Sequence, residues 1–239
     1  MTGRTGPRRG GGMIRGAMLA VLAVLLAGCS NQTETGPTPF GIARQALGQA
    51  TAGLGGKEAP TARADTPEAM AARALAANPA PLIMAQIGDG ATPQVLVEVG
   101  RNGTMRTYMN PAKQALILRD GLLSGTRGFG HDLSVAEPGS MAGLIRARQT
   151  GSGTRVMRYL SGDGVERPLP LTCTIRLGEA QTVSFAGRSW QTRQVHEACT
   201  GPGTQIQNSY LVTADGQIPA SHQWIGPGLG HVTLQVVRP

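Results

Sequence analysis

The side chains of this chain that most readily do chemistry are those of four histidines and three cysteines among 239 residues. The stretch His196-Glu197-Ala198-Cys199-Thr200 begins like the zinc-binding helix of a metalloprotease, but Thr200 stands where that motif requires its second histidine. The histidines are far apart in the sequence, at His131, His196, His222 and His231. We therefore expect no metal site and no bound cofactor, although folding can bring distant residues together.

No serine lies in the G-x-S-x-G turn that exposes a hydrolase nucleophile. Ser221 and His222 are adjacent, and neighbouring residues of a strand point to opposite faces, so they are poorly placed as a nucleophile and its base. The acidic residues are scattered, and no local pair is typical of a glycosidase. We predict no catalytic residues. Because folding can assemble a carboxylate pair, a polysaccharide-modifying hydrolase or lyase remains the enzymatic alternative.

The N-terminal segment predicts export and lipidation. Residues 1–28 contain four arginines and no acid, and they include an apolar run at 18–27 that is too short to cross a bilayer, which is typical of a signal peptide. The run ends in Leu26-Ala27-Gly28-Cys29, which resembles the lipobox of bacterial lipoproteins. By that resemblance, the bond between Gly28 and Cys29 is cut, the sulfur receives a diacylglycerol, and the new amine receives an acyl chain such as palmitate. The alternative is an ordinary signal peptide with an incidental cysteine, and either Met1 or Met13 is a workable start.

The lipobox also predicts where the protein resides. Two or three acyl chains on one residue anchor a protein stably in a membrane. Ser30 follows Cys29, where an aspartate would indicate retention in the inner membrane, so we expect the outer membrane and the periplasmic side. The chain then divides into a signal peptide (1–28), an acylated cysteine with a Gly-, Thr-, Ala- and Pro-rich flexible tether (29–66), and a β-rich periplasmic domain (67–239).

Charge and composition narrow the class of the domain. Removing the four arginines of residues 1–28 lowers the formal charge from +8 to +4, so an acidic partner is possible but not required, and export argues against nucleic acid. Charged residues make up 15%, and 35 glycines and 16 prolines interrupt the chain too often for a helical bundle or coiled coil. Aromatic residues, at 3%, are too few for extended stacking on bases or sugars.

Short apolar runs separated by turn signals predict a mostly antiparallel all-β domain. Asn102-Gly103 and Asp120-Gly121 are hairpin signals, because both central residues of such turns need positive φ. One helix is expected at 67–77, capped by Thr66, and another at 140–149. The predicted fold is a meander that forms a barrel or a sandwich. The expected strands are 82–87, 94–99, 105–109, 115–119, 122–127, 155–160, 167–177, 182–185, 189–196, 206–213, 221–225 and 232–237.

The two remaining cysteines, Cys173 and Cys199, lie in predicted strand regions, the first within the strand 167–177 and the second just after the strand 189–196, of a domain exported to an oxidising compartment. We predict that they form one disulfide. A redox or metal pair is the alternative, but no C-x-x-C spacing supports it.

Arginines alternate with apolar residues along the predicted strands, which indicates a solvated outer face. The same arrangement can form a basic surface for an acidic polysaccharide or a lipid headgroup. The arginines are Arg106, Arg119, Arg127, Arg155, Arg158, Arg176, Arg188 and Arg193.

Two stretches, together with the lipobox and the Cys173–Cys199 segment, resemble the YjbF/GfcB family of group 4 capsule polysaccharide lipoproteins. The first is the D-G-x-L-x-x-T-R-G-x-G-x-D-L run from Asp120 to Leu133. The second is Asn208-Ser209-Tyr210 followed by Ser221-His222-Gln223-Trp224. The resemblance implies a largely β, lipid-anchored outer-membrane protein that works in exopolysaccharide or capsule production and export. Its candidate partners are an acidic polysaccharide or envelope export proteins, and the resemblance carries over no catalytic residues.

Both stretches supply candidate surface residues for a glycan or a partner protein. In the first, Arg127, His131 and Asp132 offer polar contacts beside glycines that permit close approach; the alternative is a Gly-rich turn leading to the helix. In the second, Trp224 with Ser221 and Gln223 is a candidate sugar site, and the alternative is a core tryptophan beside a turn. Three functions follow: a non-enzymatic accessory of polysaccharide export, a polysaccharide-modifying enzyme, and a structural envelope lipoprotein.

Overall fold

The structure, a computed structural model, describes residues 65–160 and 165–239. Gly28, Cys29 and the predicted tether up to residue 64 lie outside the described residues. Among the helices of the described part, none is long and apolar enough to cross a membrane.

The described chain is built almost entirely of strands. Thr66 caps the first helix as predicted, because its side chain accepts a hydrogen bond from the backbone N–H of Ala69. The elements in chain order are α3 (Pro67–Ala77), β1 (Leu82–Ile87), β2 (Gln94–Asn102), β3 (Met105–Met109), β4 (Ala115–Arg119), β5 (Leu122–Arg127), β6 (Leu133–Glu137), α4 (Met141–Arg146), β7 (Gly151–Leu160), β8 (Glu166–Phe185), β9 (Arg188–Gly201), β10 (Thr204–Thr213), β11 (Ala220–Gly226) and β12 (Gly230–Arg238).

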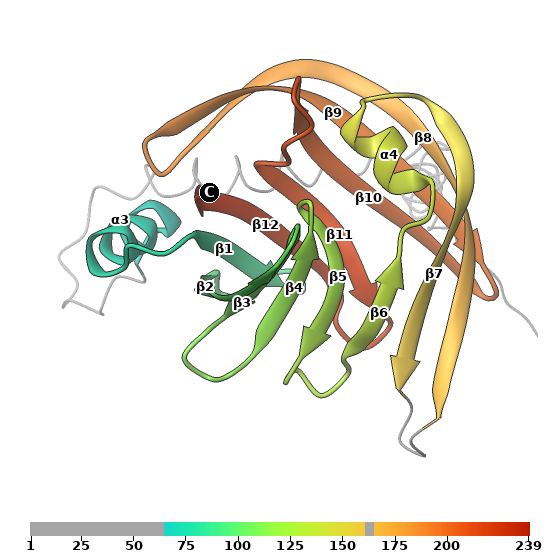
Figure 1. Cartoon of the computed structure of the whole chain (residues 1–239), viewed down its shortest axis with the longest axis horizontal. Coiled ribbons are helices and arrows are strands. Elements are labelled where there is room, and N and C mark those ends of the chain that lie inside the picture. Colours follow the sequence, from blue (N-terminus) through green and yellow to red (C-terminus); the bar gives the residue numbers. More distant parts are fainter. Residues whose placement is uncertain (1–64, 161–164) are drawn as a thin grey trace, which may run out of the picture. The chain divides into compact units, whose positions relative to one another are not determined.

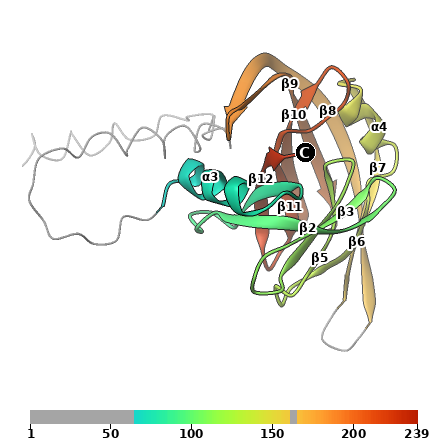
Figure 2. The same cartoon turned by 60° about the vertical axis from the view of Figure 1, so that its left-hand side comes forward.

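The twelve strands form one antiparallel sheet that curls into a nearly closed barrel (Figures 1 and 2). The sheet order is β5-β4-β3-β2-β1-β12-β11-β10-β9-β8-β7-β6, so the first and last strands pair with each other. All the remaining pairs of neighbouring strands are consecutive in the chain, as in an up-and-down meander. The described ladder is interrupted only between β5 and β6, which lie side by side in the middle of the chain. The predicted choice between barrel and sandwich is therefore resolved as a barrel.

Alternation along the strands creates two hydrophobic clusters. The larger one fills the barrel and includes Leu96, Leu116 and Ile225. The smaller one lies on the outside, where α3 packs on β1 and β12 through Ala71 and Met84. The long β8–β9 hairpin extends beyond β10, and its tip comes down beside α3 (Figure 1). Phe185 and Trp190 of that tip join the outer cluster, so the hairpin forms an arch, which we define as residues 182–192.

The elements differ from the predicted ones in several places, and β9, for example, runs to Gly201 instead of ending at His196. β6 was not expected. One strand, β8, covers both of the expected runs 167–177 and 182–185, with a register shift between Leu177 and Ala180. β7 begins at Gly151 rather than at the expected Arg155, so two glycines lie within the strand. A Cβ at Gly153 would lie 2.4 Å from the Oγ atom of Ser140, at the start of α4. Glycine therefore permits close packing there, although its type alone argues against a strand.

The two hairpin predictions have different outcomes. Asp120 and Gly121 both have positive φ, at 52° and 82°, as a type I′ turn requires. In the other hairpin Asn102 pairs with Met105, so the central residues are Gly103 and Thr104, and of these Gly103 has positive φ. The turn is thus placed one residue later than the dipeptide suggests.

Candidate functional site

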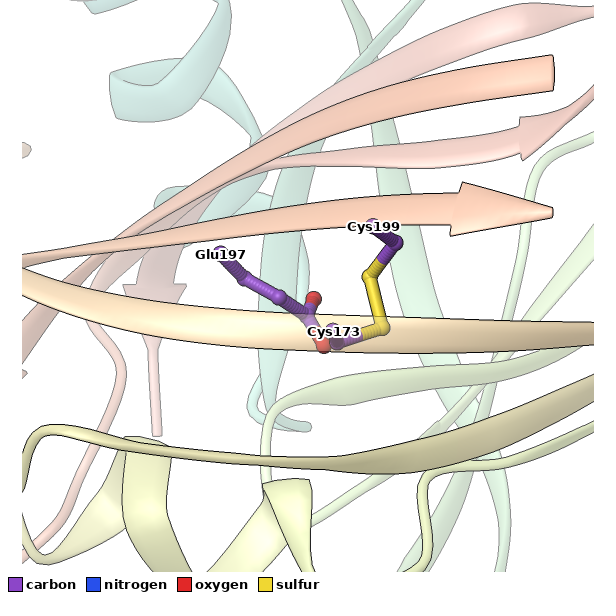
Figure 3. Close-up of side chains that lie close together, drawn as sticks. All are labelled: Cys173, Glu197 and Cys199. Carbon is purple, nitrogen blue, oxygen red and sulfur yellow. A yellow bond between two sulfur atoms is a disulfide. The ribbon is translucent and has the colours of Figure 1, made fainter.

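The predicted disulfide between Cys173 and Cys199 is present in the structure. The two residues are directly opposite each other in the β8–β9 ladder, and both point into the barrel. Glu197 is two residues before Cys199 and therefore faces the same side (Figure 3). Its carboxylate and the two sulfur atoms lie within 4.8 Å of one another, but the sulfurs are bonded together and do not act as thiolate ligands. The group is a cross-link beside a buried carboxylate.

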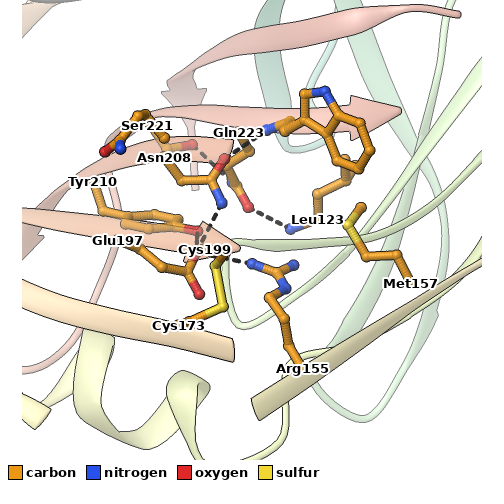
Figure 4. Close-up of polar contacts among 12 residues, drawn as sticks. Leu123, Arg155, Met157, Cys173, Glu197, Cys199, Asn208, Tyr210, Ser221 and Gln223 are labelled. Atoms are coloured by element: carbon orange, nitrogen blue, oxygen red, sulfur yellow. Dashed lines mark hydrogen bonds and ion pairs between the residues drawn. A yellow bond between two sulfur atoms is a disulfide. The ribbon is translucent and has the colours of Figure 1, made fainter. Parts of the chain in front are cut away.

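Glu197 is the centre of a buried polar cluster that we call the interior cluster: Arg155, Glu197, Asn208 and Tyr210. Its Oε2 atom accepts three hydrogen bonds of 2.8 Å, from Nη1 of Arg155, Nδ2 of Asn208 and the hydroxyl of Tyr210. Figure 4 shows these side chains converging from β7, β9 and β10. Glu197 is 0% exposed and Arg155 5%, so both charges are removed from water and depend on each other.

Burial and charge act together on the titratable groups of the interior cluster. Burial raises the pKa of Tyr210 well above its usual value, and the neighbouring Glu197 carboxylate raises it further. Burial, the largest single cause, lowers the pKa of Arg155, but the charge of Glu197, the neighbouring Tyr210 and the hydrogen bonds to both act together in the opposite direction, and the pKa is raised overall. The cluster thus holds a buried ion pair and a phenol that donates to it, an arrangement suited to fixing three strands together.

A second set of contacts ties β11 to β5 across the barrel interior. Oε1 of Gln223 accepts a hydrogen bond of 2.8 Å from the backbone N–H of Leu123, and Nε2 donates to the carbonyl of Gly121 at 3.0 Å (Figure 4). Leu123 belongs to β5, a strand at one end of the sheet, and Gly121 directly precedes β5. The Gln223 amide therefore pairs with backbone groups that a further strand would otherwise bind. The same Nε2 donates to Oγ of Ser221 at 2.9 Å.

The structure places Ser221 and Gln223 inside the barrel rather than on its outer surface, and Ser221 also lines a cavity at one end of the barrel that is described below. They are 1% and 2% exposed and face the barrel interior, because alternate residues of β11 point inward. Trp224 is half-buried, packs edge-on against Tyr159 at 6.2 Å between ring centroids, and donates its backbone N–H to Oδ1 of Asn208. Within the S-x-Q-W pattern, Gln223 is thus the residue whose side chain satisfies backbone groups inside the barrel, and Ser221 accepts a hydrogen bond from it.

The other predicted surface residues lie where β5 meets β6, a region we call the seam. Arg127 donates to the carbonyls of Leu133 (3.1 Å) and Ser134 (3.3 Å) on β6. Asp132 accepts from the Thr126 hydroxyl and from the backbone N–H of Gly128, both at 2.8 Å. Arg127 and Asp132 therefore hold the two end strands together.

His131 remains exposed on the connection between these strands. The seam also depends on close backbone approach, since a Cβ at Gly125 would lie 3.2 Å from the Ser134 carbonyl. The two stretches that carried the family resemblance meet in space, because Gln223 of the second stretch bonds the backbone of Gly121 and Leu123 in the first.

The predicted outer face of arginines is observed for most of its members, and Arg119, Arg127, Arg176, Arg188 and Arg193 are exposed. Two members are exceptions: Arg106 lines a cavity at one end of the barrel, and Arg155 points inward to Glu197. The ion pair between Arg155 and Glu197 was not predicted from the sequence. A usable signal exists, because Glu197 lies between Val195 and Cys199 at the inward positions of its strand, where an acid needs an internal partner.

The histidines do not form one site. His131 lies at the seam, His196 on β9, His222 on β11 and His231 on β12. The rings of His222 and His231 stack, with centroids 4.4 Å apart and planes within 8° of parallel. Burial and the neighbouring His231 lower the pKa of His222 to about 4.

One end of the barrel holds a cavity of about 440 Å³, which we call the mouth cavity. It lies among the turns after β2, β4 and β10, and it is lined by Arg106, Tyr108, Asp120, Arg146, Trp190 and Ser221. No local sequence pattern indicates this cavity, because its lining comes from distant strands, from the end of α4 and from the arch.

A twelve-stranded antiparallel barrel, cross-linked inside by one disulfide, defines the class of protein. The chain belongs to the family described as "Group 4 capsule polysaccharide lipoprotein gfcB, YjbF", whose model matches residues 45–237. The chain is similar in fold to the solved hypothetical lipoprotein YmcC from Escherichia coli K12, with a TM-score of 0.59 and 20% identity over 67% of this chain and 88% of that one.

A putative lipoprotein from Parabacteroides distasonis ATCC 8503 is matched with a TM-score of 0.28 and 8% identity over 66% of this chain and 94% of that one, a similarity too low to relate the folds. No curated protein matches the chain at a significant level.

Proposed function

We propose that this protein is an outer-membrane lipoprotein, anchored through Cys29, that acts as a non-enzymatic accessory in the production or export of exopolysaccharide or capsule. Family membership supports the link to capsule polysaccharide. The lipobox Leu26-Ala27-Gly28-Cys29 supports the anchor, and Ser30 supports the outer membrane. The role is to bind a glycan or an envelope export protein rather than to cut a chain.

The observation that carries the binding role is the different accessibility of the two polar sites. Glu197, the carboxylate of the interior cluster, is 0% exposed and accepts three hydrogen bonds from its own chain. A glycan cannot reach a group enclosed in this way, and a general acid must reach the glycosidic oxygen. The mouth cavity, in contrast, is open and is lined by side chains that suit binding.

Deletion of the gene in the source bacterium tests the proposal. We expect surface or secreted polysaccharide to be lost or altered, and the wild-type gene to restore it. Cys29→Ala protein should not restore it, because the domain would no longer be held at the membrane. Membrane fractionation of the rescued strain should place the wild-type protein in the outer membrane.

Three results would count against the proposal. Normal polysaccharide in the deletion strain would favour a structural envelope lipoprotein. A change in glycan chain length on incubation with purified protein would favour a hydrolase or lyase. Full rescue by Cys29→Ala would remove the anchor from the mechanism.

A further inference from the structure

The mouth cavity has the size and the setting of a ligand site. Its volume of about 440 Å³ lies within the range of about 300–1,000 Å³ that small-molecule sites occupy. Its walls come from the turns at Thr104 and Gly121, from the β10–β11 turn at Gln217, and from Trp190 on the arch. Elements far apart in the sequence therefore meet around one open space at the end of the barrel.

The floor and walls of the cavity suit a sugar ring. Ile83, Leu118 and Leu234 give apolar contact, while Tyr108 and Trp190 contribute aromatic side chains. Trp190 also packs into the outer cluster beside α3, which holds its position. Sugars have apolar ring faces and polar edges, and an aromatic wall beside hydrogen-bonding groups complements both.

The charges around the cavity leave one arginine only loosely paired, because it shares its carboxylate with a second arginine. Arg101 takes both oxygens of Glu98, at 2.8 and 3.2 Å. Arg106, which lines the cavity, is left with a contact of 3.5 Å to the same carboxylate and donates a hydrogen bond to the Tyr108 hydroxyl at 3.3 Å. Two arginines thus share one acid, and a guanidinium has five N–H donors, so Arg106 keeps donors for a ligand.

Arg146 supplies a second guanidinium from the end of α4. Its Nε donates to the carbonyl of Gly216 at 3.2 Å, which fixes the side chain against the β10–β11 turn. Its Nη1 lies 3.4 Å from Asp120, at ion-pair distance. Asp120 is therefore the acid that a ligand carboxylate would have to displace from Arg146.

We propose that the mouth cavity binds an acidic sugar residue, with the carboxylate held by Arg106 and Arg146 and the ring placed against Tyr108 and Trp190. This inference rests on the proposed function and names the chemistry of its glycan. Planar guanidinium groups match carboxylates with paired hydrogen bonds, which explains a preference for an acidic sugar over a neutral one. Thr104 and Gln217, at the rim, are placed to bond sugar hydroxyls.

Calorimetric titration of the full-length protein in detergent tests this proposal with two matched probes, tetragalacturonate and its methyl ester. We expect the acidic probe to bind at least about tenfold more tightly, since charge-assisted hydrogen bonds are stronger than neutral ones. Arg106→Gln and Arg146→Gln should each weaken binding about tenfold, and Arg106→Lys, which keeps the charge but not the planar fork, should fall between. Arg176→Gln, which changes an exposed arginine of β8, is the control and should bind like the wild type.

No binding of tetragalacturonate, equal affinity for its ester, or equal weakening by Arg176→Gln would overturn the proposal. Circular dichroism and thermal unfolding of each variant separate lost binding from lost folding. The double variant Arg106→Gln/Arg146→Gln is then expressed in the deletion strain. Failure to restore polysaccharide supports the cavity, whereas full rescue in a strain with a clear deletion phenotype removes the cavity and leaves the proposed function intact.

Discussion

In the barrel interior, Arg155 and Glu197 lie 2.8 Å apart, with 5% and 0% of their side chains exposed. At the mouth, Arg146 and Asp120 lie 3.4 Å apart, with 41% and 26% exposed. In both places an arginine is paired with a carboxylate, but one pair is enclosed in protein and the other is open to water. In the interior, each charge has lost its water and is stabilised by its partner and by hydrogen bonds. At the mouth, water screens both charges and the pair contributes little to stability.

This difference separates the work of the two regions. A pair that cannot be reached and cannot be separated without a large cost serves the fold. A pair that is loosely held and open can exchange its partner for a ligand at little cost to stability. We therefore expect the interior cluster to serve stability and the mouth cavity to serve binding, and substitutions can test this division.

Glu197→Gln should have the largest effect on stability. It leaves the Arg155 charge buried without a counter-charge, which costs about 3–5 kcal/mol of unfolding free energy. Asp120→Asn at the mouth should cost less than about 1 kcal/mol. Urea denaturation followed by circular dichroism measures both values.

The double variant Arg155→Met/Glu197→Leu provides the matched control. It removes both charges and keeps apolar bulk, so it should be more stable than Glu197→Gln alone. If Glu197→Gln and Asp120→Asn destabilise equally, the distinction between an enclosed pair and an open pair fails.

Removal of the disulfide beside Glu197 should have the second largest effect on stability. Cys173 and Cys199 are 26 residues apart, and a loop of this length stabilises by about 3.5 kcal/mol in the chain-entropy model. Cys173→Ala/Cys199→Ala should lose about that much, while the affinity of the mouth cavity for its ligand should stay unchanged. Thiol titration of denatured, unreduced protein checks the bond directly, and two free thiols from these positions would contradict it.

Much of this fold was predictable from local signals. The apolar runs and the turn dipeptides marked eleven of the twelve strands, because a half-buried strand and a tight turn each constrain their own residues. β6 escaped because its five residues lie between the glycines of the seam and Pro138. The disulfide was predictable because only Cys173 and Cys199 remain once Cys29 is assigned to the lipobox.

The polar sites were not predictable to the same degree. Gln223 has a polar side chain of a kind that is usually exposed to solvent. Only the curvature of the barrel brings it to the backbone of Leu123, 100 residues away in the chain. Arg155 and Glu197 meet for the same reason, across 42 residues. Such pairings depend on strand order and closure, which no local pattern encodes.

Gln223→Ala should have the third largest effect. It leaves the N–H of Leu123 and the carbonyl of Gly121 without their interior partner, and a buried unsatisfied group costs about 1–3 kcal/mol. Gln205→Ala, on an exposed position of β10, is the matched control and should stay within about 0.5 kcal/mol of the wild type. Hydrogen exchange should show faster opening of β5 in Gln223→Ala, and unchanged protection of β5 would show that the amide does not close the barrel.

The smallest effect is expected at His222, a partly buried residue of β11. Its pKa is lowered from 6.5 to about 4 by burial and by His231, while Asp89 acts in the opposite direction. Because the unfolded chain takes up the proton first, stability should fall as the pH drops from about 6.5 to about 4. Solvent screening of this half-exposed ring reduces the expected loss to about 1 kcal/mol.

The test is urea denaturation at pH 7 and at pH 4.5, with His222→Gln compared with His131→Gln, a change at an exposed histidine. His222→Gln should lose less stability between the two pH values than the wild type, because the unfolded state no longer gains a proton at this position. His131→Gln should follow the wild type. If both variants follow the wild type, then the stacked pair on β11 and β12 contributes nothing to acid sensitivity, and burial on the outside of this barrel is too shallow to act as burial does at Glu197.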